Sequence, residues 1–258
     1  MFKVDQLTVK VLNNRKDMGY CAAKDTIDKI RELLDVQDEV NMIFAAAPSQ
    51  SEFLDALSSS KEVNWGRINA FHMDEYIGLE KQHPERFGNF LKKEIFNKVP
   101  FKGVFYLNRN GYEPVEEIEQ YSNLLRKYPV DIVCMGIGEN THIAFNDPHV
   151  ADFKDPSLLK VVDLDERSRK QQVHDGCFPT IDDVPVSALT LTVPALLNAK
   201  YVFCIVPGKN KAEAVSHTLK DEISERYPSS ALREHPHAIL YLDEESAGKL
   251  DGHFGYAQ

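Results

Sequence analysis

The segment that decides the fold is Val130-Asp131-Ile132-Val133-Cys134-Met135-Gly136-Ile137-Gly138-Glu139-Asn140-Thr141-His142-Ile143-Ala144-Phe145-Asn146-Asp147-Pro148. Its first part is an apolar run of strand length, and its second part holds two glycines, a histidine and several polar residues. We interpret it as a strand that ends in an active-site loop. Histidine can move protons near neutral pH, and a carboxylate five residues on could orient its ring and favour the imidazolium. Taken alone, the same histidine is also compatible with a structural surface loop.

Strand-like and helix-like segments alternate on both sides of this loop. Apolar runs of strand length lie at residues 42–45, 69–73, 104–107, 201–206 and 238–242. Helices are expected along the apolar stripe Tyr20, Ala23, Ile27, Ile30 and Leu34, and then from Ser51, after Pro84, from Pro114 and over 212–223. This order predicts an α/β fold, Rossmann-like, with a doubly wound, largely parallel sheet and helices on both faces, in one domain over residues 1–258.

Sheets of this type bind ligands at the carboxyl ends of their strands. Asp74 follows the strand expected at 69–73, and His142 follows the strand that enters the quoted loop. We therefore expect the two side chains at the same edge of the sheet. The polar stretches 149–156 and 166–183 are expected to be the most loop-like or mobile parts of the chain.

Composition is typical of a cytoplasmic enzyme. The chain has 258 residues, 43% of them hydrophobic, without an apolar stretch of membrane-spanning length or the apolar core of a signal peptide near Met1. The net charge of −10 argues against nucleic acid or an anionic membrane as partner. None of the four cysteines belongs to a C-x-x-C pair, and His235 and His237 have no companion ligands, so neither a disulfide nor a metal site is expected.

The quoted loop resembles the signature of the glucosamine-6-phosphate deaminase/isomerase family, which is related to the 6-phosphogluconolactonases. A second element of the family is Phe71-His72-Met73-Asp74-Glu75-Tyr76-Ile77-Gly78-Leu79, followed by His83-Pro84-Glu85. Further similarity, in the family's order, lies at Val184-Pro185, Ala188-Leu189-Thr190, Lys211-Ala212, the Pro228, Ser230 and Leu232 pattern, and Asp243-Glu244. The resemblance implies conversion of glucosamine 6-phosphate to fructose 6-phosphate and ammonia, without cofactor or metal. We class such an enzyme as a hydrolase, deaminase and isomerase of aminosugar metabolism.

The resemblance also implies roles for four catalytic residues. His142 would open the sugar ring, Asn140 would hold the imidazole, and Asp147 would stabilise the imidazolium. Asp74 would carry a proton between C2 and C1, and burial at a strand end would raise its pKa towards the working range. The structural alternative is that Asp74 or Glu75 only caps a turn.

Phosphate recognition departs from the family pattern, which has a glycine-rich loop containing threonine after the first strand. This chain has Ala45-Ala46-Ala47-Pro48-Ser49-Gln50-Ser51 there. Ser49, Gln50 and Ser51 are our candidates, together with free amides at the start of the helix from Ser51, although Ser51 is equally suited to be a plain N-cap. Lys211 matches the family's phosphate-binding lysine, with a solvated surface lysine as the alternative.

Other departures affect the lid and the histidine loop. The family's lid falls at 166–183, where its phosphate-binding arginine has no clear counterpart, and Arg167 and Arg169 cannot be aligned with it. Thr141 replaces a glycine and would be strained if the backbone required a positive φ.

Three alternatives to the leading assignment stay open. Galactosamine 6-phosphate is a possible substrate, and a non-catalytic sugar-phosphate-binding module is a different class of function. A 6-phosphogluconolactonase is disfavoured by Ile143-Ala144-Phe145-Asn146-Asp147-Pro148, since lactonases usually have T-A-S-L-F-P there. The expected partner is a small sugar phosphate, and a homo-oligomer is expected from the resemblance alone.

Overall fold

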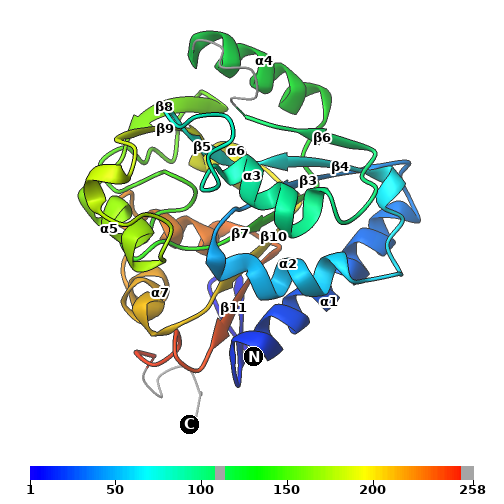
Figure 1. Ribbon diagram of the computed structural model, residues 1–258. Helices are drawn as coiled ribbons and strands as arrows, with labels where there is room; N and C mark the ends of the chain where they lie inside the picture. The colour runs from blue at the N-terminus through cyan, green and yellow to red at the C-terminus, as the bar shows by residue number, and fades with distance from the viewer. Residues whose placement is uncertain (108–113, 251–258) are drawn as a thin grey trace.

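The computed structural model describes residues 1–107 and 114–250, and within them eight strands form the central sheet (Figure 1). Their order is β1-β2-β11-β10-β7-β3-β4-β6, and every neighbouring pair is parallel except β1 with β2. The strands are β1 (Phe2–Val4), β2 (Leu7–Leu12), β3 (Val40–Phe44), β4 (Ile68–His72), β6 (Gly103–Phe105), β7 (Ile132–Met135), β10 (Tyr201–Val206) and β11 (Ala238–Asp243). The predicted α/β fold with a largely parallel sheet is confirmed.

Helices pack on both faces of this sheet. One core lies under α1 (Arg15–Leu34), α2 (Ser51–Ser58), α3 (Phe87–Leu91) and the π-helical turn η3 (Lys92–Phe96). The other lies under α4 (Pro114–Lys127), α6 (Val193–Leu197) and α7 (Ala212–Lys220). Strand β3 shows the alternation, because Ile43 joins the second core while Met42 and Phe44 join the first. No helix among the described residues is long and apolar enough to cross a membrane.

A second, three-stranded antiparallel sheet, which the sequence analysis missed, stands beside the first. It consists of β5 (Asp74–Tyr76), β9 (Ser187–Leu191) and β8 (Leu159–Asp163), in that order. Only Met73 separates β4 from β5, so Asp74 is the first residue of a new strand. The chain therefore passes from one sheet to the other at the proposed catalytic carboxylate.

Several predicted helices need correction. Of the apolar stripe expected on α1, Ala23 and Ile30 are buried, whereas Tyr20 is 67% exposed. The buried face of α1 also includes Met18, Ala22, Thr26 and Leu33. Helix α7 ends at Lys220 rather than at 223, and the polar segment 166–183, expected to be loop-like, contains α5 (Glu166–His174) and a 3-10 turn, η4 (Ile181–Asp183). Polar composition misled us at α5, because its buried face is itself polar.

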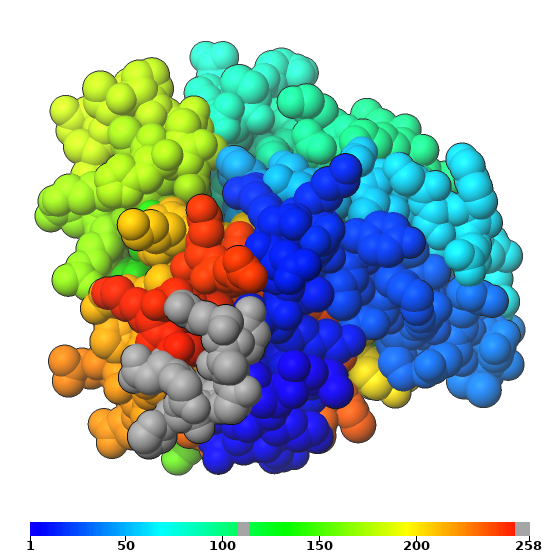
Figure 2. All heavy atoms as spheres, turned by 90° about the horizontal axis from the view of Figure 1, so that it is seen from below, coloured from blue at the N-terminus to red at the C-terminus, as the bar shows by residue number. Residues whose placement is uncertain are grey.

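The two ends of the described chain meet in the large sheet. Strand β2 pairs in parallel with β11, with Val9 opposite Leu240. In Figure 2, which views the molecule from below, the blue N-terminal segment accordingly lies against the red segment near the C-terminus.

Gly19 explains why α1 and α2 pack so closely. A Cβ at this position would lie 2.8 Å from Cβ of Glu52 and 2.9 Å from its carbonyl carbon. We expect Gly19→Ala to lower the free energy of unfolding by about 1–3 kcal/mol, because the helices must separate. Urea titration would measure this, with Gly66→Ala as control, since a Cβ there would lie 3.6 Å from Oδ1 of Asn64, an ordinary van der Waals contact. Equal stability of the two variants would contradict this packing.

Candidate active site

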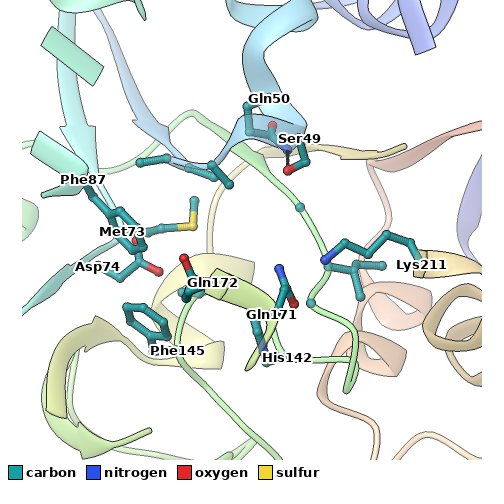
Figure 3. Close-up of a pocket in the computed structure, with 17 residues that line it drawn as sticks. Ser49, Gln50, Met73, Asp74, Phe87, His142, Phe145, Gln171, Gln172 and Lys211 are labelled. Atoms are coloured by element: carbon teal, nitrogen blue, oxygen red, sulfur yellow. Dashed lines mark hydrogen bonds between the residues drawn. The ribbon is translucent and has the colours of Figure 1, made fainter. Parts of the chain in front are cut away.

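One pocket, of about 490 Å³ including its open mouth, lies at the carboxyl edge of the large sheet. Its walls follow β3, β4, β7 and β10 in turn, which is where parallel sheets bind ligands. Figure 3 shows Asp74 and Phe145 on one side, Lys211 on the other, and His142 with Gln171 between them. The structure therefore places Asp74 and His142 on the same pocket.

His142 is held by three groups at one ring nitrogen. Its Nδ1 lies 2.7 Å from Oδ1 of Asn140, 2.8 Å from Oγ of Ser168 and 3.1 Å from Oδ1 of Asp147. The amide of Asn140 donates to the same Asp147 oxygen at 2.9 Å, and the Ser168 hydroxyl also donates to it. Asn140 and Asp147 thus lie behind the imidazole and support it from outside the pocket lining.

This arrangement fixes which nitrogen of His142 carries a hydrogen. The Asn140 amide and the Ser168 hydroxyl donate to Asp147, so the oxygen atoms that face Nδ1 act as acceptors. Nδ1 must then hold its proton, assigned here from the hydrogen-bond network, and Nε2 is the nitrogen that can gain or lose one. An imidazole arranged in this way can act as acid or base towards a ligand in the pocket.

Asp147 is buried and remains ionised. Burial alone would raise its pKa, but hydrogen bonds with His142, Ser168 and Asn140 outweigh burial and hold the pKa well below the usual aspartate value. The side chain is fully inaccessible to solvent. A fixed negative charge therefore lies beside Nδ1 of His142, with Oδ1 of Asp147 at 3.1 Å.

The loop that carries His142 has a strained backbone. Thr141 adopts φ of +71° and Ala144 adopts +48°, both in the left-handed region. The positive φ that would strain a β-branched residue at 141 is therefore present, at a cost on the order of 1–3 kcal/mol. Hydrogen bonds hold the turn, from the Gly138 amide to the His142 carbonyl at 2.8 Å and from the Ser229 amide to the Thr141 carbonyl at 2.9 Å.

Asp74 lies in the opposite wall and is 6% exposed. Burial, and then the neighbouring charge of Glu75, raise the pKa of Asp74 well above the usual aspartate value. Such a carboxylate is a stronger base than a solvated one, once it has lost its proton.

Glu75 and His72 hold this wall in place. The carboxylate of Glu75 accepts hydrogen bonds from the amides of Tyr76, Phe87 and Gly88, at 2.9 to 3.1 Å. Burial lowers the pKa of His72 to about 4, so the ring is neutral. It accepts from the Leu107 amide at 2.9 Å through Nε2, and its Nδ1 lies 2.9 Å from the Asp74 carbonyl. The turn-capping alternative fits Glu75, which bonds to backbone amides, better than Asp74, which lines the pocket.

Three of the four candidates for phosphate binding line the pocket. Lys211 is 3% exposed, follows β10 and lines the pocket, and burial lowers its pKa. Ser49 and Gln50 also line it, and Gln50 Nε2 donates to Ser49 Oγ at 3.2 Å (Figure 3). The same nitrogen donates to the Ile205 carbonyl at 3.1 Å.

Ser51 does not line the pocket, and its expected role needs correction. A 3-10 turn, η1 (Pro48–Gln50), precedes α2, so Ser51 is the first residue of α2 and its amide donates to the Pro48 carbonyl. The amide of Gln50 likewise donates to the Ala47 carbonyl at 2.9 Å. Neither amide is available to an anion, and Ser51 is not an N-cap.

Segment 166–183 contributes two glutamines to the pocket that sequence reasoning missed. Gln171 and Gln172, both on α5, line the pocket, and Gln171 Oε1 accepts from the Glu139 amide at 2.8 Å. Arg169 donates to the carbonyls of Ile181 and Val184, at 2.6 and 3.1 Å, so it joins α5 to η4 and to the residue that follows η4. Ser168 was also missed, because a serine in a polar helix gives no signal without the fold.

Comparison with known proteins identifies the family. The family model described as glucosamine-6-phosphate isomerases/6-phosphogluconolactonase matches residues 13–241. The chain belongs to this isomerase/lactonase family. The glucosamine-6-phosphate deaminase of Streptococcus sanguinis (strain SK36) is 30% identical over 227 residues, covering 88% of this chain and 94% of the relative. That of Exiguobacterium sp. (strain ATCC BAA-1283 / AT1b) is 34% identical over 183 residues, 70% of each chain.

Solved structures agree with this membership of the isomerase/lactonase family. A monomeric glucosamine-6-phosphate deaminase superposes with a TM-score of 0.84 at 29% identity, over 94% of this chain and 99% of that one. A 6-phosphogluconolactonase from Thermotoga maritima has a TM-score of 0.71 at 21% identity, over 92% of this chain and 99% of that one, and shows the shared fold. Because one member is monomeric, membership of the family does not by itself imply an oligomer.

One part of the sequence-based assignment is wrong. We classed the enzyme as a hydrolase, whereas the relatives are named glucosamine-6-phosphate deaminases and the family model names isomerases together with 6-phosphogluconolactonase. The comparisons support the classes deaminase and isomerase.

Proposed function

We propose that this protein converts glucosamine 6-phosphate to fructose 6-phosphate and ammonia. The observation that carries the proposal is the placement of Asp74 and His142 on one pocket, with a raised pKa at Asp74 and Nε2 of His142 left free to exchange a proton. An aldose–ketose conversion needs two such groups, one for the ring oxygen and one for carbon.

We propose that His142 opens the pyranose. Its Nε2 transfers a proton from the anomeric hydroxyl to the ring oxygen, which leaves an aldehyde at C1. Asp147 stabilises the imidazolium while the proton is held, and Asn140 keeps Nδ1 fixed. Acid–base assistance of this kind is worth about 10² to 10⁴ in rate.

Asp74 then removes the proton from C2, and a proton from water on O1 completes the enol. Asp74 returns the proton that it holds to C1. The nitrogen at C2 becomes an iminium, which water converts to the ketone as ammonia leaves. Asp74 and Lys211 lie on opposite sides of the pocket (Figure 3), and we place C1 and C2 of the hexose at Asp74 and its phosphate at Lys211. We also propose that residues 166–183 form a lid, since α5 contributes Gln171 and Gln172 to the wall.

In this proposal Lys211 supplies the positive charge that binds the substrate phosphate, and Ser49 and Gln50 line the pocket beside it. We expect Lys211→Met to raise KM for the sugar phosphate by about tenfold or more with a smaller change in kcat, because a hydrogen bond from a charged group is worth about 1.5–3 kcal/mol. Steady-state kinetics would measure it, with Lys209→Met, on the exposed part of the same turn, as control. An unchanged KM in Lys211→Met would remove this lysine from phosphate binding.

The function is tested by incubating the purified protein with three substrates. These are glucosamine 6-phosphate, galactosamine 6-phosphate and 6-phosphogluconolactone, with ammonia, ketose phosphate and acid as products to be followed. We expect ammonia and ketose phosphate in equal amounts from glucosamine 6-phosphate. The proposal would be rejected if neither aminosugar phosphate gave ammonia, or if acid from the lactone were the only product formed.

A further inference from the structure

The first turn of α5 is bonded to the same carboxylate that supports His142. Asp147 Oδ2 accepts from the Asp165 amide at 3.0 Å, and Asp147 Oδ1 accepts from the Ser168 hydroxyl. Asp165 is the N-cap of α5, so Asp147 binds the start of this helix while its other contacts face Nδ1 of His142. One buried carboxylate thus joins the lid segment to the proposed acid–base group.

The buried face of α5 is polar. Ser168, Gln171 and Gln172 are its buried residues, at the spacing that places side chains on one face of a helix. Val173 is the only apolar residue of the helix, and it is partly buried. Hydrogen bonds to the active-site region therefore contribute much of what holds α5 on the protein, and such an element opens more easily than an apolar one.

We propose that Ser168 is a positioning residue that couples docking of α5 to assembly of the His142–Asp147 pair. When α5 is docked, the Ser168 hydroxyl donates to Asp147 and its oxygen lies 2.8 Å from Nδ1 of His142. When α5 moves away from the pocket, Asp147 loses the hydroxyl that donates to it, and Nδ1 of His142 loses the oxygen that accepts from it. The pair is then complete only while Gln171 and Gln172, on the same helix face, line the closed pocket. This inference rests on the function proposed above, but part of its test does not.

The test compares Ser168→Ala with Ser168→Thr, which keeps the hydroxyl, and with Lys170→Ala, an exposed change on the same helix. In Ser168→Ala we expect kcat for glucosamine 6-phosphate to fall by about tenfold, with a smaller change in KM, since a hydrogen bond to a charged group is lost. Amide exchange over 165–174 should rise by about tenfold, and the Nδ1 resonance of His142 should move. Ser168→Thr and Lys170→Ala should stay close to wild type in all three measurements.

The outcomes separate this inference from the proposed function. If no aminosugar is turned over, the function fails, and exchange of α5 and the His142 resonance still decide the role of Ser168. Unchanged exchange or an unchanged His142 resonance in Ser168→Ala would overturn the coupling. So would equal losses of kcat in Ser168→Ala and Ser168→Thr, because packing rather than the hydroxyl would then matter.

Discussion

Asp74→Asn should lower kcat for glucosamine 6-phosphate by about 10² to 10⁴ while substrate still binds, because the amide cannot accept the C2 proton. The side chain keeps its size and its place at the start of β5. Steady-state kinetics and calorimetric binding would measure the two effects separately. Asp163→Asn, in β8 of the same small sheet but exposed, is the matched control. Wild-type-like kcat in Asp74→Asn would remove this carboxylate from the mechanism.

The same variant should be more stable than wild type at neutral pH. Burial and the charge of Glu75 raise the pKa of Asp74, so the folded protein prefers the protonated carboxyl. The stability that the protonated Asp74 contributes is therefore fully present below the pKa of aspartate in the unfolded chain, about 3.9. It is lost as the pH rises through the pKa of Asp74 in the folded protein. We expect Asp74→Asn to be more stable than wild type at neutral or alkaline pH and to match wild type at acid pH. Urea titrations across this range measure the difference, and a pH-independent difference would contradict the raised pKa.

Gly138→Ala should lower kcat by on the order of 10²-fold, because a displaced catalytic group costs about that much. A Cβ there would lie 2.1 Å from Cε1 and 2.3 Å from both nitrogens of the His142 ring. Asn140, Ser168 and Asp147 hold the ring from the other side, so it must give up these contacts to move away.

Gly138 is not among the glycines with positive φ, so the backbone itself tolerates alanine. The free energy of unfolding should nevertheless fall by about 1–3 kcal/mol, because the displaced ring gives up hydrogen bonds with buried groups. Gly66→Ala, on a distant exposed turn, is the control for the substitution itself. A crystal structure of Gly138→Ala should show the imidazole displaced. Full activity with the ring in place would show that the loop accommodates a methyl group and that His142 does not depend on this glycine.

The sequence predicted the large sheet because its buried strands are continuous apolar runs, as at 201–206, with amphipathic segments between them. It did not predict the small sheet, whose strand β5 has only three residues, Asp74–Tyr76, and no periodicity of its own. Helix α5 was missed because its buried side is polar, which makes the segment resemble a loop.

For the site, local motifs identified the groups that surround His142 within one loop. Asn140, His142 and Asp147 lie within eight positions of one another, so their contacts follow from sequence neighbourhood. Ser168 and Gln172 come from a distant segment and reach the pocket only through tertiary packing. Ser51 failed as a candidate because a 3-10 turn, which a serine pattern does not signal, begins the helix earlier.

The most direct test of the central claim is a crystal structure of Asp74→Asn with glucosamine 6-phosphate bound. The account predicts the phosphate at Lys211, Nε2 of His142 within hydrogen-bond reach of the ring oxygen or anomeric hydroxyl, and the side chain at position 74 within about 3.5 Å of C1 or C2. A sugar bound in this pocket with C1 and C2 turned away from position 74, or out of reach of His142, would contradict it.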